Sequence, residues 1–504
     1  MHPMNGSYRK LCEILGEVAD LRVASAVLEW DQQTYMPPGG AGGRALALGT
    51  LGTLAHARFV SDEVGALLEA AQAELKQADP DSDEARLLKV TRRLYDKERK
   101  VSGEWVGEFT RETSLAQQAW QQARAVSDFA RFQPHLERVM ALRRAYADFF
   151  APYDSVYDPL LDDFEPGMKT AEVRAIFEAL RPQQVALIQA IVDKGPVVDD
   201  RLLYQAYDEQ AQWDFGLEVA RTFGYDLARG RQDRSAHPFT TDFGHGDVRI
   251  TTRLDPNFLP KGMFGTFHET GHALYGQGVP EAYYRTPLAT ALSLAVHESQ
   301  SRTWENLIGR SRPFWTHFYP RLQKAFPGPL GGVDLETFYR AVNKVEPSLI
   351  RVEADEATYN LHIMLRFELE LALMEGRLAV ADLPAAWNER VQEFLGLTPP
   401  DDAHGVLQDI HWSGGGVGYF PTYALGNLVA AQLWEAVLAA VPDLEARIAR
   451  GEFAALLDWQ RRNLHQFGGK FEPMELIARA TGAPLSPEPY LRYLRGKFGA
   501  IYGL

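Results

Sequence analysis

The segment GTFHETGH (265–272) carries the side chains best suited to chemistry in this sequence. If the segment is helical, His268 and His272 lie one turn apart on the same face, so that both imidazoles can reach one Zn²⁺ ion. Glu269 lies beside such an ion and is placed to take a proton from a catalytic water. Among the 13 histidines of the chain, a chance H-E-x-x-H has a probability of about a few per cent. The motif alone is therefore weak evidence for a metal site, and further evidence must come from the residues that flank it.

A catalytic zinc site needs a third protein ligand and an open position for water. Thr286 and Pro287 are typical of a helix start and predict a helix that continues to Gly309. This helix carries Glu298, which follows His272 at a distance that lets an antiparallel neighbour return past the histidines. A His-His-Glu set suits zinc and tolerates cobalt.

Two alternatives exist for this third position. Glu298 could form a simple ion pair with Arg302, four positions further on. Apolar residues at Leu294 and Ala295 precede Glu298 on the same face, however, and favour a buried carboxylate with a strong partner. His297 is the rival ligand, but it points about 100° away around the helix. We therefore favour Glu298.

Helical periodicity dominates the elements that must position these residues. Apolar residues recur at helical spacing over 8–31, prolines and glycines break the pattern at 36–43, and a second helix is expected just after. Residues 247–254 alternate polar and aliphatic side chains and predict a strand, and 236–241 predict a weaker one. The sequence thus predicts a nearly all-α protein with one small β-sheet near residue 245. Further amphipathic helices are expected at 61–76, 83–98, 103–127, 129–153, 170–194 and 200–223.

The composition excludes several classes of protein. Apolar residues make up 46% and charged residues 24% of the chain, which is typical of a folded globular protein. The net charge of -15 argues against a protein that mainly binds nucleic acid. The single cysteine, Cys12, excludes an intramolecular disulfide and favours a reducing compartment. The sequence shows neither a secretory leader nor an apolar run long enough to span a bilayer, so we expect a cytoplasmic protein without a membrane partner.

Several further motifs occur in a fixed order around the metal-site motif. WDQQTYMPPGGAGGRA (30–45), HPF (237–239) and DVRIT (247–251) precede HETGH, while HESQSR (297–302), IRVEAD (350–355) and GVLQDIHW (405–412) follow it. Together these motifs resemble the carboxypeptidase Taq family of zinc metallocarboxypeptidases over essentially the whole chain. That family is akin to the thimet oligopeptidases and the angiotensin-converting enzymes.

The resemblance implies a metal-dependent peptidase that removes single amino acids from peptide C-termini, with broad specificity and poor action at proline. It implies His268, His272 and Glu298 as ligands of zinc, with cobalt tolerated, and Glu269 as the base. A single metallopeptidase domain over 1–504 is expected, with an N-terminal helical part at 1–230 and a metal-site part at 231–504. Two helical halves would flank a deep substrate groove. The expected partners are peptides with a free C-terminus and a second copy of the chain in a homodimer.

A carboxypeptidase must bind the terminal carboxylate of its substrate, and arginine is well suited to this task. Arg351 is the first candidate. The pattern of residues 348–370 predicts a largely interior helix. A guanidinium in such a helix is costly unless it faces a carboxylate or lines a water-filled groove. The alternative pairs Arg351 with Glu353 or Asp355 inside the fold. Arg249 on the predicted strand is the second candidate, with a surface cross-strand charge as its alternative.

Other residues are candidates for supporting roles. Asp355 could orient a ligand histidine through its second ring nitrogen. The resemblance implies a tyrosine hydroxyl at the oxyanion of the tetrahedral intermediate, and Tyr423 is preferred over Tyr419 because it enters a rigid helix. Packing is the alternative for both tyrosines. Taken alone, His237 and His411 would be expected to have structural roles. The resemblance implies instead that they contact the substrate or form hydrogen bonds in the transition state.

Two other functions remain open at this point. An endo-acting zinc oligopeptidase would keep the metal chemistry and dispense with capture of the terminal carboxylate. A non-catalytic helical binding protein would retain or lose the metal. An intact Glu269 argues against the second of these functions.

Overall fold

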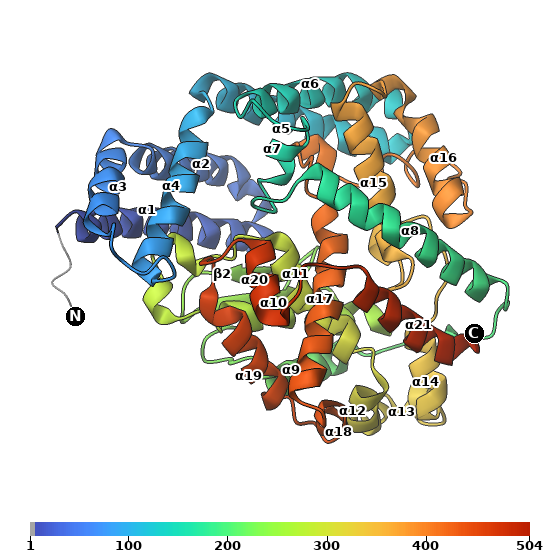
Figure 1. The fold of residues 1–504 in the computed structure, drawn as a ribbon. Coiled ribbons are helices and arrows are strands. Elements are labelled where there is room, and N and C mark those ends of the chain that lie inside the picture. The colour runs from blue at the N-terminus through green and yellow to red at the C-terminus, as the bar shows by residue number, and fades with distance from the viewer. Residues whose placement is uncertain (1–5) are drawn as a thin grey trace.

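The computed structural model describes residues 6–504, and the helices predicted for the N-terminal part are present (Figure 1). Ser61, Ser82 and Ser102 each accept a backbone N–H of the following helix, which explains why three of these helices begin where they do. A 3-10 turn at Pro38–Gly40 separates the first two helices. The helices are α1 (Gly6–Thr34), α2 (Ala41–Phe59), α3 (Asp62–Glu74), α4 (Asp83–Lys100), α5 (Gly103–Val126) and α6 (Phe129–Asp148).

The helix predicted over 200–223 is shorter than expected. Arg201–Leu203 forms only a 3-10 turn, and α9 (Glu209–Phe223) begins where the side chain of Asp208 accepts the backbone N–H of Ala211. The short α7 (Asp158–Leu161) and the long α8 (Thr170–Val192) precede it.

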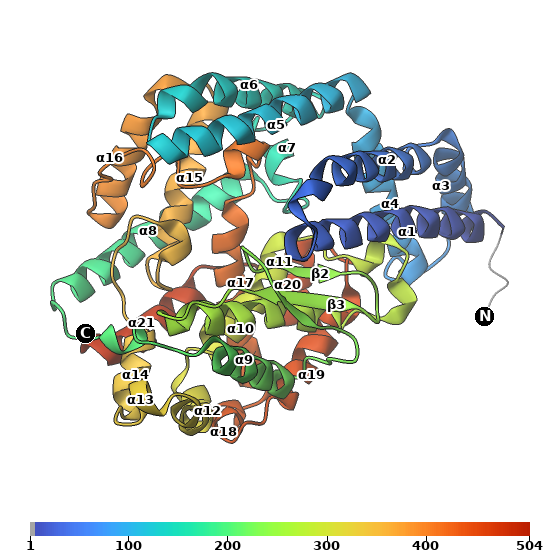
Figure 2. The ribbon, with the colours of Figure 1, turned by 180° about the vertical axis from the view of Figure 1, so that it is seen from behind.

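A three-stranded sheet follows α9, as the sequence predicts. Its order is β1-β3-β2, with β1 (Gln232–Arg234) parallel and β2 (Thr240–Asp242) antiparallel to the central β3 (Val248–Thr252). The strand expected at 247–254 is thus confirmed, and the weaker one shortens to β2. Strand β1 is not predicted by the alternation pattern, because it has only three residues and all of them are polar. In Figure 2, β2 and β3 lie between α1 and α10 (Leu259–Gly276).

The segment after α10 differs from the single helix predicted from Thr286 to Gly309. Thr286 does cap a turn, but only the 3-10 turn Pro287–Ala289 follows it. The helix that carries Glu298 is α11 (Leu294–Arg302), which Ser293 caps by accepting the backbone N–H of Val296. It continues into a π-helical turn at Thr303–Ile308, a conformation often found at functional sites. Another 3-10 turn lies at Glu281–Tyr283.

The helix predicted over 348–370 also begins later than expected. Arg351–Glu353 forms a 3-10 turn, and α15 starts at Tyr359, so Arg351 lies outside the helix. Further 3-10 turns occur at Val380–Asp382, His411–Gly414 and His465–Phe467. The remaining helices are α12 (Arg312–Ala325), α13 (Pro327–Leu330), α14 (Leu335–Val342), α15 (Tyr359–Met374), α16 (Leu383–Leu395), α17 (Pro421–Ala440), α18 (Leu444–Ala449), α19 (Ala454–Asn463), α20 (Pro473–Thr481) and α21 (Glu488–Tyr502).

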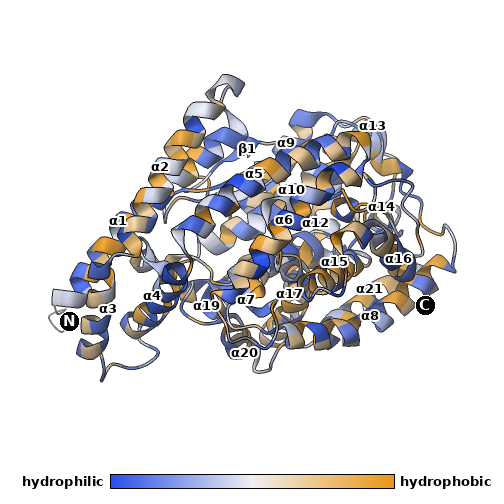
Figure 3. Ribbon diagram, turned by 90° about the horizontal axis from the view of Figure 1, so that it is seen from above, coloured by the Kyte–Doolittle hydropathy of each residue, from blue (hydrophilic) through white to orange (hydrophobic). Residues whose placement is uncertain are grey.

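Helix α17 occupies the centre of the molecule (Figure 1). Every residue from Ala424 to Leu433 is buried, and the helix packs against α11, α15, α20 and α21. Most other helices show hydrophobic and hydrophilic residues in turn along their length (Figure 3), as expected for helices with one buried face. The fold is nearly all-α with one small sheet, as predicted. None of the helices formed by residues 6–504 combines the length and the apolar character needed to cross a membrane.

Candidate metal centre and active site

The close approach of α10 and α11 brings the predicted ligands together. A Cβ atom at Gly271 would lie 2.6 Å from the backbone oxygen of Gln300, so only glycine allows this contact. On the other side of α11, a Cβ atom at Gly426 of α17 would lie 2.6 Å from Cγ of Glu298. The two glycines thus let α10, α11 and α17 pack around the Glu298 side chain.

His268, His272 and Glu298 offer three ligand atoms within 4.8 Å of one another. The Oε2 atom of Glu298 lies 3.5 Å from Nε2 of His268 and 3.5 Å from Nε2 of His272. Two ligands about 2.1 Å from a tetrahedral zinc ion are about 3.4 Å apart, so these separations fit zinc. The residues present therefore suit a metal of this coordination geometry.

The second ring nitrogen of each histidine has a partner of its own. Nδ1 of His268 lies 2.8 Å from Oε2 of Glu305, and Nδ1 of His272 lies 2.5 Å from Nδ1 of His297. Both rings thus direct Nε2 at Glu298. The carboxylate behind His268 is the usual partner of a metal-binding histidine, whereas His272 has a second imidazole in this position. His297, the alternative ligand, thus contacts the Nδ1 side of the His272 ring, whereas Glu298 lies on the Nε2 side.

Glu305 occupies the role that the sequence analysis gave to Asp355. The Asp355 carboxylate instead accepts the backbone N–H groups of Glu346, Ala357 and Thr358, and so shapes the turn before α15. That expectation was wrong. A signal for Glu305 existed, because it follows Glu298 by two helical turns and therefore lies on the same face.

Glu298 is buried and negatively charged. Nε of Arg302 donates to Oε1 at 2.7 Å and the Ser301 hydroxyl to Oε2 at 2.9 Å. The expected pair with Arg302 thus forms, but inside the protein and together with the histidines. Burial would raise the pKa of Glu298, yet Arg302 and His268 hold it far below its usual value. Burial would also lower the pKa of His268, but Glu298 and Glu305 outweigh it and raise this pKa to about 9.

Glu269 follows the first histidine and is 6% exposed. The hydroxyl of Thr240 on β2 lies 2.7 Å from its Oε2 atom and donates a hydrogen bond to it. The small sheet therefore orients the carboxylate that was predicted to act as the base.

Arg351 lies in a buried cluster of charges rather than on a helix. Its Nε and Nη2 groups donate to Oδ1 of Asp409 at 3.0 and 2.9 Å, and Nη1 donates to the Tyr359 hydroxyl at 3.0 Å. Nε of Arg366 donates to Oδ2 of the same aspartate at 2.7 Å. Two buried guanidinium groups thus share one carboxylate. Asp409, rather than Glu353 or Asp355, is the partner of Arg351.

His411, Tyr419 and Tyr423 lie beside this cluster. The guanidinium of Arg351 is 5.1 Å from the ring centre of Tyr423, and the His411 ring is 5.4 Å from that of Tyr419. The two tyrosine hydroxyls are 3.4 Å apart. Burial lowers the pKa of His411 to about 4 despite the nearby Asp409, and its Nδ1 atom is buried without a hydrogen-bond partner among residues 6–504.

Arg249 and His237 lie elsewhere. Arg249 donates to both carboxylate oxygens of Asp247 and lies 4.5 Å from the ring centre of Trp30 and 4.9 Å from that of Phe243. His237 is exposed in the segment between β1 and β2. The contacts of Arg249 are thus with the sheet region and α1, while those of Arg351 are with Asp409, α15 and α17.

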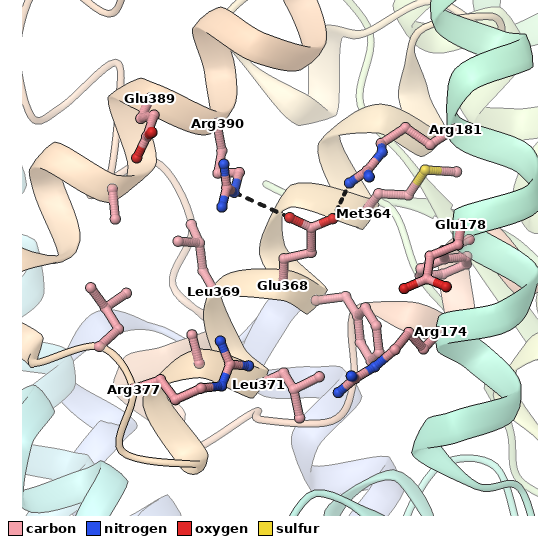
Figure 4. Close-up of a pocket in the computed structure, with 15 residues that line it drawn as sticks. Arg174, Glu178, Arg181, Met364, Glu368, Leu369, Leu371, Arg377, Glu389 and Arg390 are labelled. Carbon is pink, nitrogen blue, oxygen red and sulfur yellow. Dashed lines mark hydrogen bonds and ion pairs between the residues drawn. The ribbon is translucent and has the colours of Figure 1, made fainter.

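A cavity of about 390 Å³ between α8, α15 and α16 contains none of the predicted site residues. Figure 4 shows Glu368 between Arg181 and Arg390, with which it forms ion pairs. Arg390 also pairs with Glu393, and Arg174 and Arg377 pair with Glu375. Because each arginine of this cavity has an acidic partner within the chain, we assign no ligand to it.

Two histidines from one helix, a glutamate from the next and Glu269 between the histidines are the ligand and base types expected of a helical metallopeptidase. The family model for carboxypeptidase Taq (M32) metallopeptidases matches residues 10–498. Thermostable carboxypeptidase 1 of Thermus thermophilus is 46% identical over 99% of both chains, and carboxypeptidase 1 of Bacillus subtilis is 36% identical over 98% of both. The crystal structure of an M32 carboxypeptidase from Deinococcus radiodurans is 42% identical, with a TM-score of 0.97 over 99% of this chain and 100% of that chain. The chain therefore belongs to the carboxypeptidase Taq (M32) family of metallopeptidases.

Membership in this family confirms the resemblance given by the motifs. The protein is a metallocarboxypeptidase, a peptide hydrolase that depends on a metal. This result favours the carboxypeptidase over the endo-acting and the non-catalytic alternatives.

Proposed function

We propose that this metallocarboxypeptidase uses zinc held by His268, His272 and Glu298. The observation that supports this proposal most strongly is the 3.5 Å separation between the Glu298 oxygen and Nε2 of each histidine. When bound, zinc supplies polarisation of the scissile carbonyl and a lowered pKa of the attacking water. Cobalt is expected to replace zinc, because the same ligand types suit both ions.

Glu269 is the proposed general base. The hydrogen bond from Thr240 holds one carboxylate oxygen, and the other oxygen takes the proton of the attacking water. The same carboxyl group then returns the proton to the leaving amine.

Arg351 is the proposed contact for the terminal carboxylate of the substrate. Arg351 and Arg366 share only Asp409, so the cluster carries one excess positive charge. A buried positive charge is costly unless it is balanced, and the carboxylate of a bound peptide would balance it. This contact would make the enzyme release single residues from a free C-terminus.

The remaining site residues are assigned supporting roles. Tyr423 is the proposed hydrogen-bond donor to the oxyanion, with Tyr419 as the second choice, and neutral His411 the proposed donor to the substrate. Arg249 and His237 are proposed to contact the peptide from the side of the sheet. Broad specificity, poor action at proline and a homodimer complete the proposal.

One experiment separates exo-action from endo-action. A peptide is incubated with the enzyme as the free acid and as the C-terminal amide, and the products are read by mass spectrometry. We expect a ladder of single-residue losses from the free acid alone. Excess chelator should abolish the ladder, and Zn²⁺ or Co²⁺ should restore it. Cleavage of the amide at a similar rate would favour an endopeptidase, and full activity after verified metal removal would contradict the metal-dependent mechanism.

The ligand set is tested by two neighbouring substitutions on α11. Glu298→Ala removes a proposed ligand, whereas His297→Ala removes the residue behind His272, so zinc affinity should fall much further in the first variant. The reverse order would move the third ligand to His297.

A further inference from the structure

A cavity of about 430 Å³ shares two of its wall residues with the surroundings of the metal centre. It lies between α1, β2 and the C-terminal end of α10, where Figure 2 shows α1 beside the sheet. Thr240 lines the cavity and bonds Glu269, and His297 lines it and contacts His272. The cavity is therefore one side chain away from the proposed base and from a proposed ligand.

The wall contributed by α1 is apolar. Ala19, Val23 and Ala26 lie at helical spacing, line the cavity and are only partly buried by the rest of the chain. Leu15 and Val18 lie fully buried on the same wall. The volume falls in the range of roughly 300–1,000 Å³ that ligand pockets occupy. An apolar group that covers this apolar surface removes both from water, which lowers the free energy of the complex.

The two arginines of this cavity already have acidic partners. Arg22 pairs with Glu98 and Arg285 pairs with Asp20, whereas Asp242 accepts a hydrogen bond from the Tyr284 hydroxyl and forms no ion pair with residues 6–504. Because both cations are paired and Asp242 would repel a further negative charge, the cavity favours apolar groups over anionic ones.

The Arg351 cluster lies on the other side of the metal centre. Arg302 donates to Glu298 at 2.7 Å and lies 4.7 Å from the ring centre of Tyr359, whose hydroxyl accepts from Arg351. Helices α15 and α17 frame this cluster, whereas α1, β2 and α10 frame the cavity. For a peptide that reaches Arg351 with its carboxylate and the metal centre with its scissile carbonyl, this arrangement directs the preceding residues toward the cavity side, where Thr240 and His297 lie.

We propose that the cavity binds apolar side chains of the substrate residues that precede the scissile bond. The proposal rests on the proposed function, because the direction of the peptide depends on the carboxylate binding at Arg351. Peptides with leucine before the scissile bond should therefore be better substrates than peptides with glycine there.

Two acetylated tetrapeptides with the same C-terminal alanine test this preference. In one peptide the three residues before alanine are glycine, and in the other the second and third residues are leucine. The parent enzyme should show a kcat/KM about tenfold or more higher for the leucine peptide, the usual effect of an apolar pocket.

Ala19→Phe and Ala26→Phe fill the cavity and should reduce this ratio to about one tenth of its parent value or less. The rate on the glycine peptide should fall much less than the rate on the leucine peptide, because glycine places no side chain in the cavity. Ala24→Phe is the matched control, because Ala24 lies on α1, is exposed and does not line the cavity. It should retain the parent ratio. Zinc content and melting temperature verify the fold of each variant.

Val23→Lys provides a second, positive test that does not depend on filling the cavity. It should lower the rate on the leucine peptide and raise the rate on a peptide with glutamate at the same positions. Equal cleavage of the glycine and leucine peptides by the parent, or an unchanged ratio in all the cavity variants, would overturn the cavity proposal alone. An enzyme that releases alanine from neither peptide would overturn the proposed function instead.

Discussion

Glu305 is expected to control how tightly the metal centre binds its ion. Its Oε2 atom lies 2.8 Å from Nδ1 of His268 and 3.2 Å from Nη1 of Arg302. Removing the carboxylate releases the His268 ring and lowers its basicity, which typically costs 10- to 100-fold in metal affinity. Glu305→Ala should therefore weaken zinc binding by about 10- to 100-fold, equivalent to about 1.4–2.7 kcal/mol.

Glu305→Gln is a smaller perturbation. Its amide oxygen can still accept the hydrogen bond from His268, but it lacks the charge that faces Arg302. We expect a loss near the lower end, about tenfold. Competition with a chelator of known affinity measures zinc binding, and kcat at saturating zinc should fall much less than the affinity does.

Glu336→Gln is the matched control. Glu336 also pairs with an arginine, Arg312, but both side chains are about half exposed on α12 and α14. This variant should bind zinc as the parent does. If Glu305→Ala binds zinc with an affinity within about twofold of the parent, Glu305 does not strengthen metal binding through its contact with His268.

Three further predictions concern other parts of the site. Arg351→Ala should lower kcat/KM on a free-acid peptide by about 30-fold or more at unchanged metal content, with partial rescue in Arg351→Lys; a small loss here and a large one in Arg249→Ala would reassign the contact. Gly271→Ala, whose Cβ would meet the α11 backbone at 2.6 Å, should lower both melting temperature and zinc affinity, and a variant with parent values would refute the packing argument. Burial raises the pKa of Glu165 from 4.5 to about 8, so its stabilising contribution is complete below about pH 4.5 and is lost as the pH rises toward 8. Glu165→Gln should therefore gain about 3–4 kcal/mol relative to the parent between about pH 5 and about pH 8, as urea midpoints at the two pH values would show.

Local patterns explain why much of this molecule could be predicted from its sequence. Helix starts depend on side chains within a few residues, as the serine caps at Ser61, Ser82 and Ser102 show. The spacing of His268 and His272 likewise places both rings on one face of a single helix. These features require no knowledge of distant contacts.

The errors arose where local hydrogen bonds or distant partners decide the structure. Asp355 accepts N–H groups of the next residues and delays the start of α15, so Arg351 falls in a separate turn. The partner of Arg351 is Asp409, which is far away in the sequence and could not be chosen by spacing. The division of the chain near residue 230 stays a prediction.

A paired measurement on Glu269→Gln tests most directly whether Glu269 acts as the general base beside a bound zinc ion. Zinc per chain and kcat on one free-acid peptide are determined for this variant and the parent. Because the amide cannot take the proton of the attacking water, we expect about one zinc per chain and a kcat about 10²–10⁴-fold lower. If the variant keeps its zinc and hydrolyses the peptide at nearly the parent rate, Glu269 is not the general base.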